Sequence, residues 1–192
     1  MNRHIPPRAP RHRPALLAVL GTAFLVALLV APPRLAADPR IEDHETQGDY
    51  FTIGVDPRVA QLNANAERFH LGEDTFWGAY RAGKYTAALN ELRFILRYLP
   101  NHPRALYLMG EVCRASGDLF YPIRYFERAL TLYPHRAYTR AQYGAYFLSI
   151  GETAAAVREL RQAVATDSTL LVARAWLRDA EAKARPAPSH AP

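Results

Sequence analysis

Apolar residues recur at steps of three and four along much of the chain after residue 57, the spacing that buries one face of a helix. Three stripes are clearest: Ala88, Leu92, Ile95, Leu96 and Leu99; Ile123, Phe126, Ala129 and Leu130; and Ala156, Val157, Leu160, Ala163 and Val164. Pro100 and Pro134 follow the first two stripes, where proline forbids continuation of a helix. The pattern predicts an all-α fold.

The stripes belong to a longer repeat. Gly83, Gly117 and Gly151 fall 34 residues apart, each between two apolar helical stretches. Glycine suits the left-handed residue that ends a helix, where a side chain would clash. A fixed period of this size is typical of stacked helix-turn-helix units.

The segments that begin at these glycines read GKYTAALNELRFILRYLP, GDLFYPIRYFERALTLYP and GETAAAVRELRQAVATDS. They resemble the tetratricopeptide repeat. The resemblance implies an α-solenoid of three repeats, at residues 69–102, 103–136 and 137–170. It also implies that the small residues Gly110 and Gly144 let the two helices of one unit approach closely, whereas Phe76 stands at this position in the first unit.

The flanks of the repeats complete the predicted architecture. Residues 171–185 predict a capping helix, with Leu171 among the side chains that cover the apolar end of the stack, and residues 186–192 predict a disordered tail. Residues 57–68 predict a further helix before the repeats. The polar stretch within residues 32–56 predicts a linker, although the structure of the short apolar run YFTIGV stays open.

The amino terminus predicts export. A basic region at residues 1–14 precedes residues 15–31, which carry no charge. Seventeen residues of helix rise about 26 Å against a hydrocarbon core of about 30 Å. The segment therefore predicts a single-pass anchor in a bacterial inner membrane with the repeats on the periplasmic side, or a signal sequence cleaved near Ala37 that leaves them soluble in the periplasm.

Most of the formal net charge of +6 comes from the amino terminus. Five of the 24 basic residues and none of the 18 acidic residues lie before Asp38. From Asp38 onward the balance is 24 − 5 = 19 against 18, or +1. A nearly neutral exported part does not favour nucleic-acid binding.

Chemistry-bearing motifs are scarce. Cys113 is the only cysteine, so neither an intramolecular disulfide nor a cysteine metal cluster can form, and we expect a buried, inert thiol. Neither a glycine-rich phosphate loop nor a nucleophile motif occurs. We therefore expect no enzymatic activity and no cofactor.

The histidines give no firm metal site. His70 has the spacing that would place Glu73 and Asp74 on its helical face, but an acid-rich helix start is the commoner cause of this pattern. His102 and His135 occupy turns beside prolines, which predicts that both lie on the surface.

The resemblance implies that the first helices of successive units line a concave groove for a protein or peptide partner. Carried over by position, the groove residues are His70, Glu73, Trp77, Tyr80, Arg104, Tyr107, Glu111, Arg114, Tyr138 and Gln142. Aromatic and arginine side chains are enriched at protein interfaces, so we expect the aromatic members to anchor the partner and the arginines to bind acidic groups. The alternative is that Tyr80 or Tyr107 packs between helices.

These patterns lead to one main functional prediction. The chain is expected to be a non-enzymatic adaptor at the inner membrane that assembles an envelope, secretion or polysaccharide-export complex. The alternative is a soluble periplasmic domain that binds a small ligand or glycan, or serves as accessory subunit of an enzyme. Self-association of the repeat arrays is a third expectation.

Overall fold

The computed structural model describes residues 47–185, all within the second of the two compact units of the chain, residues 35–192. Its helices are η1 (Tyr50–Thr52), α1 (Pro57–Asn65), η2 (Ala66–His70), η3 (Glu73–Trp77), α2 (Gly78–Arg81), α3 (Tyr85–Tyr98), α4 (Pro103–Ser116), α5 (Ile123–Leu132), α6 (Ala137–Ser149), α7 (Thr153–Thr166) and α8 (Leu171–Ala184). These residues contain no strand, which confirms the all-α prediction for them. The predicted anchor, the start of the linker and the tail lie outside the described residues.

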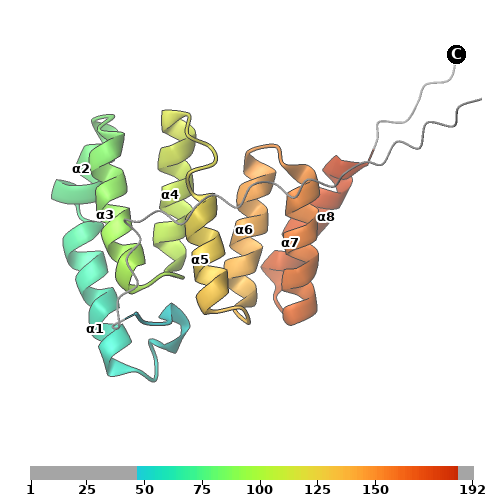
Figure 1. Ribbon diagram of the computed structural model, residues 1–192, viewed down its shortest axis with the longest axis horizontal. Coiled ribbons are helices and arrows are strands. Elements are labelled where there is room, and N and C mark those ends of the chain that lie inside the picture. The colour runs from blue at the N-terminus through green and yellow to red at the C-terminus, as the bar shows by residue number, and fades with distance from the viewer. Residues whose placement is uncertain (1–46, 186–192) are drawn as a thin grey trace, which may run out of the picture. The chain divides into compact units, whose positions relative to one another are not determined.

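The helices follow one another in a row from α1 at one end to α8 at the other (Figure 1). α4 contacts both α3 and α6, and α6 contacts α7 and α8. Between residues 47 and 185, no helix has the length and apolar character needed to cross a bilayer.

The repeated glycines end helices as predicted. Gly83, Gly117 and Gly151 have φ values of 68°, 85° and 86°, and they are the described residues with positive φ. Only glycine occupies this left-handed region without a steric cost from Cβ. The chain therefore reverses direction between two helices at each of the three glycines.

The apolar stripes form the core. Leu92 and Leu160 are fully buried and Phe126 is 2% exposed, and all three belong to one hydrophobic cluster. Phe76, at the position that holds a small residue in the later units, is also fully buried. Its ring stacks parallel to that of Tyr80, with the ring centroids 5.8 Å apart. Aromatic rings therefore fill the space in the first predicted unit. At the equivalent positions Gly110 and Gly144, the absence of a side chain allows close packing instead.

The two small residues allow close approaches, but to different partners. A Cβ on Gly144 would lie 2.6 Å from Cγ of Leu160, so α6 and α7 approach closely as predicted. A Cβ on Gly110 would instead lie 2.8 Å from the ring of Tyr146 on α6. The large Tyr146 ring takes the space beside α4 that we expected α5 to occupy.

The first helical segment runs past residue 68, the boundary before the first predicted repeat. α1 continues through a π-helical turn, η2, to His70, and the helical segment ends at Leu71 and Gly72. Gly72 is extended, and its N–H donates to Oγ1 of Thr75 at 3.1 Å, which starts the next helical segment. His70 therefore ends one helical segment instead of beginning the next, as the boundary at residue 69 had implied.

Residues 47–56, here called the N-terminal arm, are the described end of the predicted linker, and they pack against the helices. The N–H of Gly48 donates to the carbonyl of Tyr98 at 2.8 Å. A Cβ on Gly48 would lie only 2.7 Å from Cγ2 of Val59, so this close approach requires glycine. The run YFTIGV, left open by the sequence, begins with the short helix η1.

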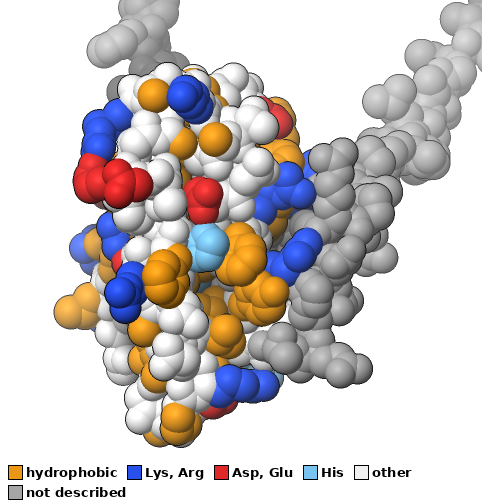
Figure 2. Space-filling view, turned by 90° about the vertical axis from the view of Figure 1, so that its left-hand side faces the viewer, with side chains coloured by type: hydrophobic (Ala, Val, Ile, Leu, Met, Phe, Trp, Pro, Cys, Tyr) orange, Lys and Arg blue, Asp and Glu red, His pale blue; other side chains and the backbone are white. Residues whose placement is uncertain are grey.

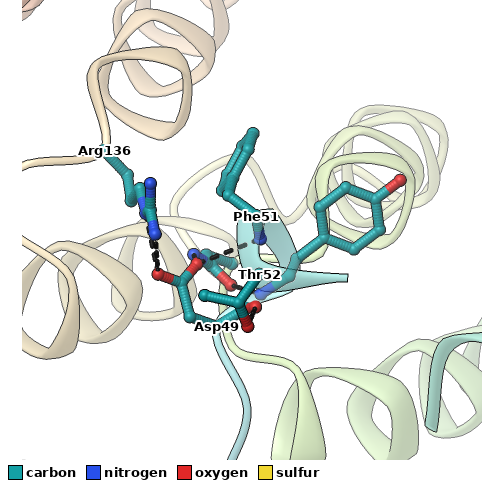
Figure 3. A network of polar contacts seen from close by, with 6 residues as sticks. Asp49, Phe51, Thr52 and Arg136 are labelled. Atoms are coloured by element: carbon teal, nitrogen blue, oxygen red, sulfur yellow. Dashed lines mark hydrogen bonds and ion pairs between the residues drawn. The ribbon is translucent and has the colours of Figure 1, made fainter. Parts of the chain in front are cut away.

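Asp49 fastens the arm to two loops between helices, as Figure 3 shows. Its Oδ1 accepts hydrogen bonds from the N–H of Phe51 at 3.1 Å and from Nδ2 of Asn101 at 2.7 Å. Its Oδ2 accepts from Nε and Nη2 of Arg136 at 2.7 and 2.5 Å. Asn101 in turn accepts from the N–H of Tyr50 at 2.8 Å, so the arm bridges the α3–α4 and α5–α6 loops.

α8 occupies nearly the range predicted for the capping helix. Its Ala173 and Ala180 are fully buried, and Trp176 packs against the core. Leu171 is 73% exposed, contrary to the prediction that it covers the end of the stack. The buried stripe passes through Ala173, Trp176 and Ala180 at steps of three and four, and Leu171 lies off that face.

Candidate functional site

A cavity of about 150 Å³, here called the groove cavity, opens between α4, α6 and α8. Its lining residues are Leu106, Tyr107, Glu111, Phe126, Gln142, Ala145, Tyr146, Ser149 and Trp176. Four of the nine are aromatic, and Glu111 is the single charged member. The cavity therefore offers an apolar interior with a polar rim.

The rim is formed by Tyr107 and a neighbouring ion pair. Tyr107 is 58% exposed, which leaves most of its ring available for contact. Nη2 of Arg114 donates to both carboxylate oxygens of Glu111, at 2.5 and 2.6 Å. The negative charge of Glu111 is the main cause that raises the pKa of Tyr107, so this hydroxyl stays protonated at neutral pH.

Internal hydrogen bonds hold the interior of the cavity. The hydroxyl of Tyr146 donates to the carbonyl of Leu119 at 2.6 Å, and burial raises the pKa of Tyr146. Nε2 of Gln142 donates to the carbonyl of Pro103 at 3.0 Å. Backbone carbonyls therefore hold both side chains in place.

Three of the predicted groove residues line this cavity: Tyr107, Glu111 and Gln142. Arg114 joins them through its pair with Glu111. Arg104, in the first turn of α4, donates instead to Glu67 of η2. The arginines that we expected to bind acidic groups of a partner are thus paired within the chain.

The aromatic residues of the first unit mainly pack inward. The ring centroids of Trp77 and Phe76 lie 4.9 Å apart, and both Trp77 and Tyr80 pack against the core. Glu73 pairs with Arg81. For Tyr80, this is the packing alternative that the sequence left open.

His70 and Tyr138 lie away from the groove cavity. Nδ1 of His70 lies 2.7 Å from Oε2 of Glu91 on α3, not beside Glu73 or Asp74. No group of three potential metal ligands occurs in the part of the chain that the structure describes. Tyr138 instead lines a second cavity of about 380 Å³, together with Phe51, His135, Arg136, Ala137, Thr166, Asp167 and Leu170.

The prediction missed Trp176 and Tyr146 as cavity residues. The 34-residue period could have identified Trp176, because Leu108, Gln142 and Trp176 are 34 residues apart and so occupy equivalent positions. The predicted groove positions end with the third unit, and α8 is predicted only as a cap. Tyr146 carried no such signal, because its role depends on the space beside Gly110.

His102 is buried, contrary to the prediction that it lies on the surface. It is 1% exposed, its Nδ1 accepts from the N–H of Ala105 at 3.1 Å, and its Nε2 lies 2.9 Å from Oδ1 of Asn63. The ring of Tyr50 covers it at 4.9 Å, so α1 and the arm enclose this turn. Burial lowers the pKa of His102 to about 4.

Cys113 is fully buried, as expected. Burial raises the pKa of its thiol to about 12, so the reactive thiolate is scarce at neutral pH.

The chain matches no known protein family and no curated protein sequence.

Proposed function

We propose that this chain is a non-enzymatic adaptor of tetratricopeptide type that binds a protein partner in the groove cavity. In this proposal residues 15–31 tether the repeats to an inner membrane, on its periplasmic side, where they assemble an envelope, secretion or polysaccharide-export complex. The 34-residue period and the left-handed glycines support the repeat assignment. The uncharged segment after a basic region supports the tether.

The groove cavity is the observation that carries the binding proposal. Tyr107 is largely exposed at its rim, and Trp176 reaches its wall from α8. Aromatic side chains at such a position supply large contact area with little loss of rotamer entropy. The adjoining cation of Arg114 is already neutralised by Glu111, so an uncharged side chain of the partner suits the cavity best.

The size of the cavity favours a polypeptide over a whole small ligand. Small-molecule sites usually enclose about 300–1,000 Å³. A cavity of about 150 Å³ is large enough for a benzene ring. The groove cavity has this smaller volume, so it supports the insertion of one apolar side chain while the rest of the partner lies across the rims of α4, α6 and α8.

Site-specific photocrosslinking in living cells tests this binding surface. A photoreactive phenylalanine at Tyr107 is expected to crosslink a discrete protein partner. The same group at Phe120 is the matched control, because Phe120 is 57% exposed and does not line the cavity. Equal crosslinking of one partner from both positions would count against the groove cavity.

Alanine substitutions give a quantitative second test. Tyr107→Ala and Trp176→Ala are each expected to weaken binding of the crosslinked partner about tenfold or more, which is a typical hot-spot loss. Phe120→Ala should leave the affinity unchanged. Circular dichroism should show unaltered helicity in Tyr107→Ala, because this ring is mostly exposed.

The second cavity favours the alternative of a soluble periplasmic domain that binds a small ligand or glycan. Its volume of about 380 Å³ lies within the usual range for small ligands, and it combines aromatic and charged side chains. Fractionation separates the two proposals. Protein that washes free of membranes and lacks residues 1–37 would support the alternative, whereas full-length protein that needs detergent for release would support the adaptor.

A further inference from the structure

An apolar hollow of about 160 Å³, here called the end groove, opens between the α1–η2 segment and α3. Its apolar wall includes Leu62, Ala66, Phe94, Ile95, Tyr98 and Leu99. Phe94 is 45% exposed and stacks on His70 at 4.1 Å. Figure 2 shows hydrophobic side chains gathered around a histidine on this face.

The two ends of the row of helices differ. The exposed side of α8 carries the charged residues Arg174, Arg178 and Lys183 beside the exposed Leu171. The α1–α3 end instead leaves Phe94 and a hollow exposed. The exposed ring of Phe94 beside an apolar hollow makes this end of the row a candidate docking surface.

The chain enters the described fold beside this hollow. Gly48 bonds to the carbonyl of Tyr98, and its Cα packs beside Val59 and Leu99. Tyr98 and Leu99 are also walls of the end groove. The described chain therefore begins at the edge of the hollow, and the seven residue-to-residue steps from Ile41 to Gly48 can span up to about 25 Å.

We infer that residues 38–46 of this chain dock in the end groove and place the side chain of Ile41 in the hollow. Ile41 is the only large apolar residue in this segment, which reads DPRIEDHET. The hollow has the volume for one such side chain. The covalent connection keeps the segment at a high effective concentration beside its site.

The charges of the segment and its site are complementary. Residues 38–46 carry four carboxylates and one arginine, a balance of 1 − 4 = −3. The α1, η2 and α3 helices carry four arginines and two glutamates, a balance of 4 − 2 = +2. Both glutamates are already engaged, Glu91 by His70 and Glu67 by Arg104, and Arg58 is likewise paired with Asp56 just before α1.

Docking also shortens the connection to the proposed membrane tether, and only this consequence rests on the proposed function. With Ile41 held in the end groove, residues 32–40 alone would separate the uncharged segment from the helices. Nine residues span at most about 32 Å.

Disulfide trapping in the full chain tests the docking. Ile41→Cys combined with Asn65→Cys, at the edge of the end groove, is expected to form an intramolecular disulfide under mild oxidation. Ile41→Cys combined with Arg178→Cys on α8 is the control, and tethering should make its closure about tenfold slower or more. The native Cys113 thiol is fully buried and does not interfere. Equal closure rates for the two pairs would overturn the inference, as would disulfide-linked dimers from the first pair, which would assign the end groove to a second copy.

Thiol accessibility gives an independent readout. In the full chain in detergent, maleimide labelling of Asn65→Cys is expected to accelerate several-fold when Ile41→Asp is added and to stay unchanged with Ile41→Leu. Unchanged labelling in both backgrounds would overturn the inference. Protection that appears only in vesicles of anionic phospholipid, with or without Ile41→Asp, would assign the cover to lipid and also overturn it. Neither experiment uses the groove cavity, so the binding proposal can fail while docking holds.

Discussion

At the scale of single residues, His102 shows how burial changes the chemistry of one side chain. It caps α4 through Nδ1 and contacts Asn63 of α1 through Nε2. Both contacts suit the neutral ring with its proton on Nε2, because Nδ1 must accept a hydrogen bond. The imidazolium ion could not accept at Nδ1, so protonation would break the cap.

Stability should therefore fall in mild acid. The pKa of His102 is about 4 in the fold and about 6.5 in an unfolded chain. Because the folded value is the lower one, this contribution to stability is complete above pH 6.5 and is lost as the pH falls through about 4. The difference of about 2.5 pKa units corresponds to about 3 kcal/mol in the free energy of unfolding.

Denaturant unfolding between pH 7.5 and 4 measures this effect. His102→Gln should flatten the pH dependence, although it will also lower stability at neutral pH. His135→Gln is the matched control, because His135 is exposed and its loss should leave the slope unchanged. A wild-type slope that survives His102→Gln would show that another group is responsible.

At the scale of elements, the N-terminal arm is held by polar contacts as well as by packing. Asp49 joins the arm to Asn101 and Arg136, which belong to two different loops. Charge-assisted hydrogen bonds accepted by a partly buried carboxylate are stronger than those between neutral groups. The arm therefore stabilises the α3–α4 and α5–α6 connections together.

Asp49→Asn should loosen the arm, because an amide cannot replace the two-bond ion pair with Arg136. We expect a loss of about 1–3 kcal/mol in the free energy of unfolding and faster hydrogen exchange at the Tyr50 and Phe51 amides. Asp56→Asn is the control with the same change in charge. Asp56 caps α1, and asparagine caps a helix about as well. If the amide hydrogens of Tyr50 and Phe51 exchanged at equal rates in the two variants, the role of Asp49 would be refuted.

At the scale of the whole molecule, each helix depends on its neighbours. α7 contacts α6 and α8, and its Leu160 is fully buried against Gly144 of α6. α7 thus buries its apolar face between two neighbouring helices. Loss of packing at one interface should therefore lower the stability of the whole row of helices.

Leu160→Ala is expected to cost about 2–5 kcal/mol, as for other buried leucines. Leu171→Ala, at a leucine that is 73% exposed, should change stability by less than about 0.5 kcal/mol. Trp77 and Trp176 lie at opposite ends of the row, so far-UV circular dichroism and tryptophan fluorescence should report one shared transition. Separate transitions, or an unaffected Leu160→Ala variant, would show that the helices do not unfold together.

Local physics made much of the fold predictable. The left-handed glycines and the stripes through Leu92, Phe126 and Leu160 follow from backbone sterics and helical periodicity, which involve only near neighbours. The same period places Tyr107, Gln142 and Trp176 on first helices of the repeating pattern. These three cavity residues could therefore be predicted from the sequence.

Tertiary structure decided which partner covers each face. A stripe records that a helix face is buried, but not what buries it, so the approach of Tyr146 to Gly110 could not be foreseen. The burial of His102 likewise depends on α1 and the arm, which are distant in sequence from its turn. Periodicity by itself determined most of the helices, their reversals at the three glycines and most of their apolar faces. Contacts between residues far apart in the chain determined the cavity, the arm and the exposed end, because packing selects among side chains that share one local pattern.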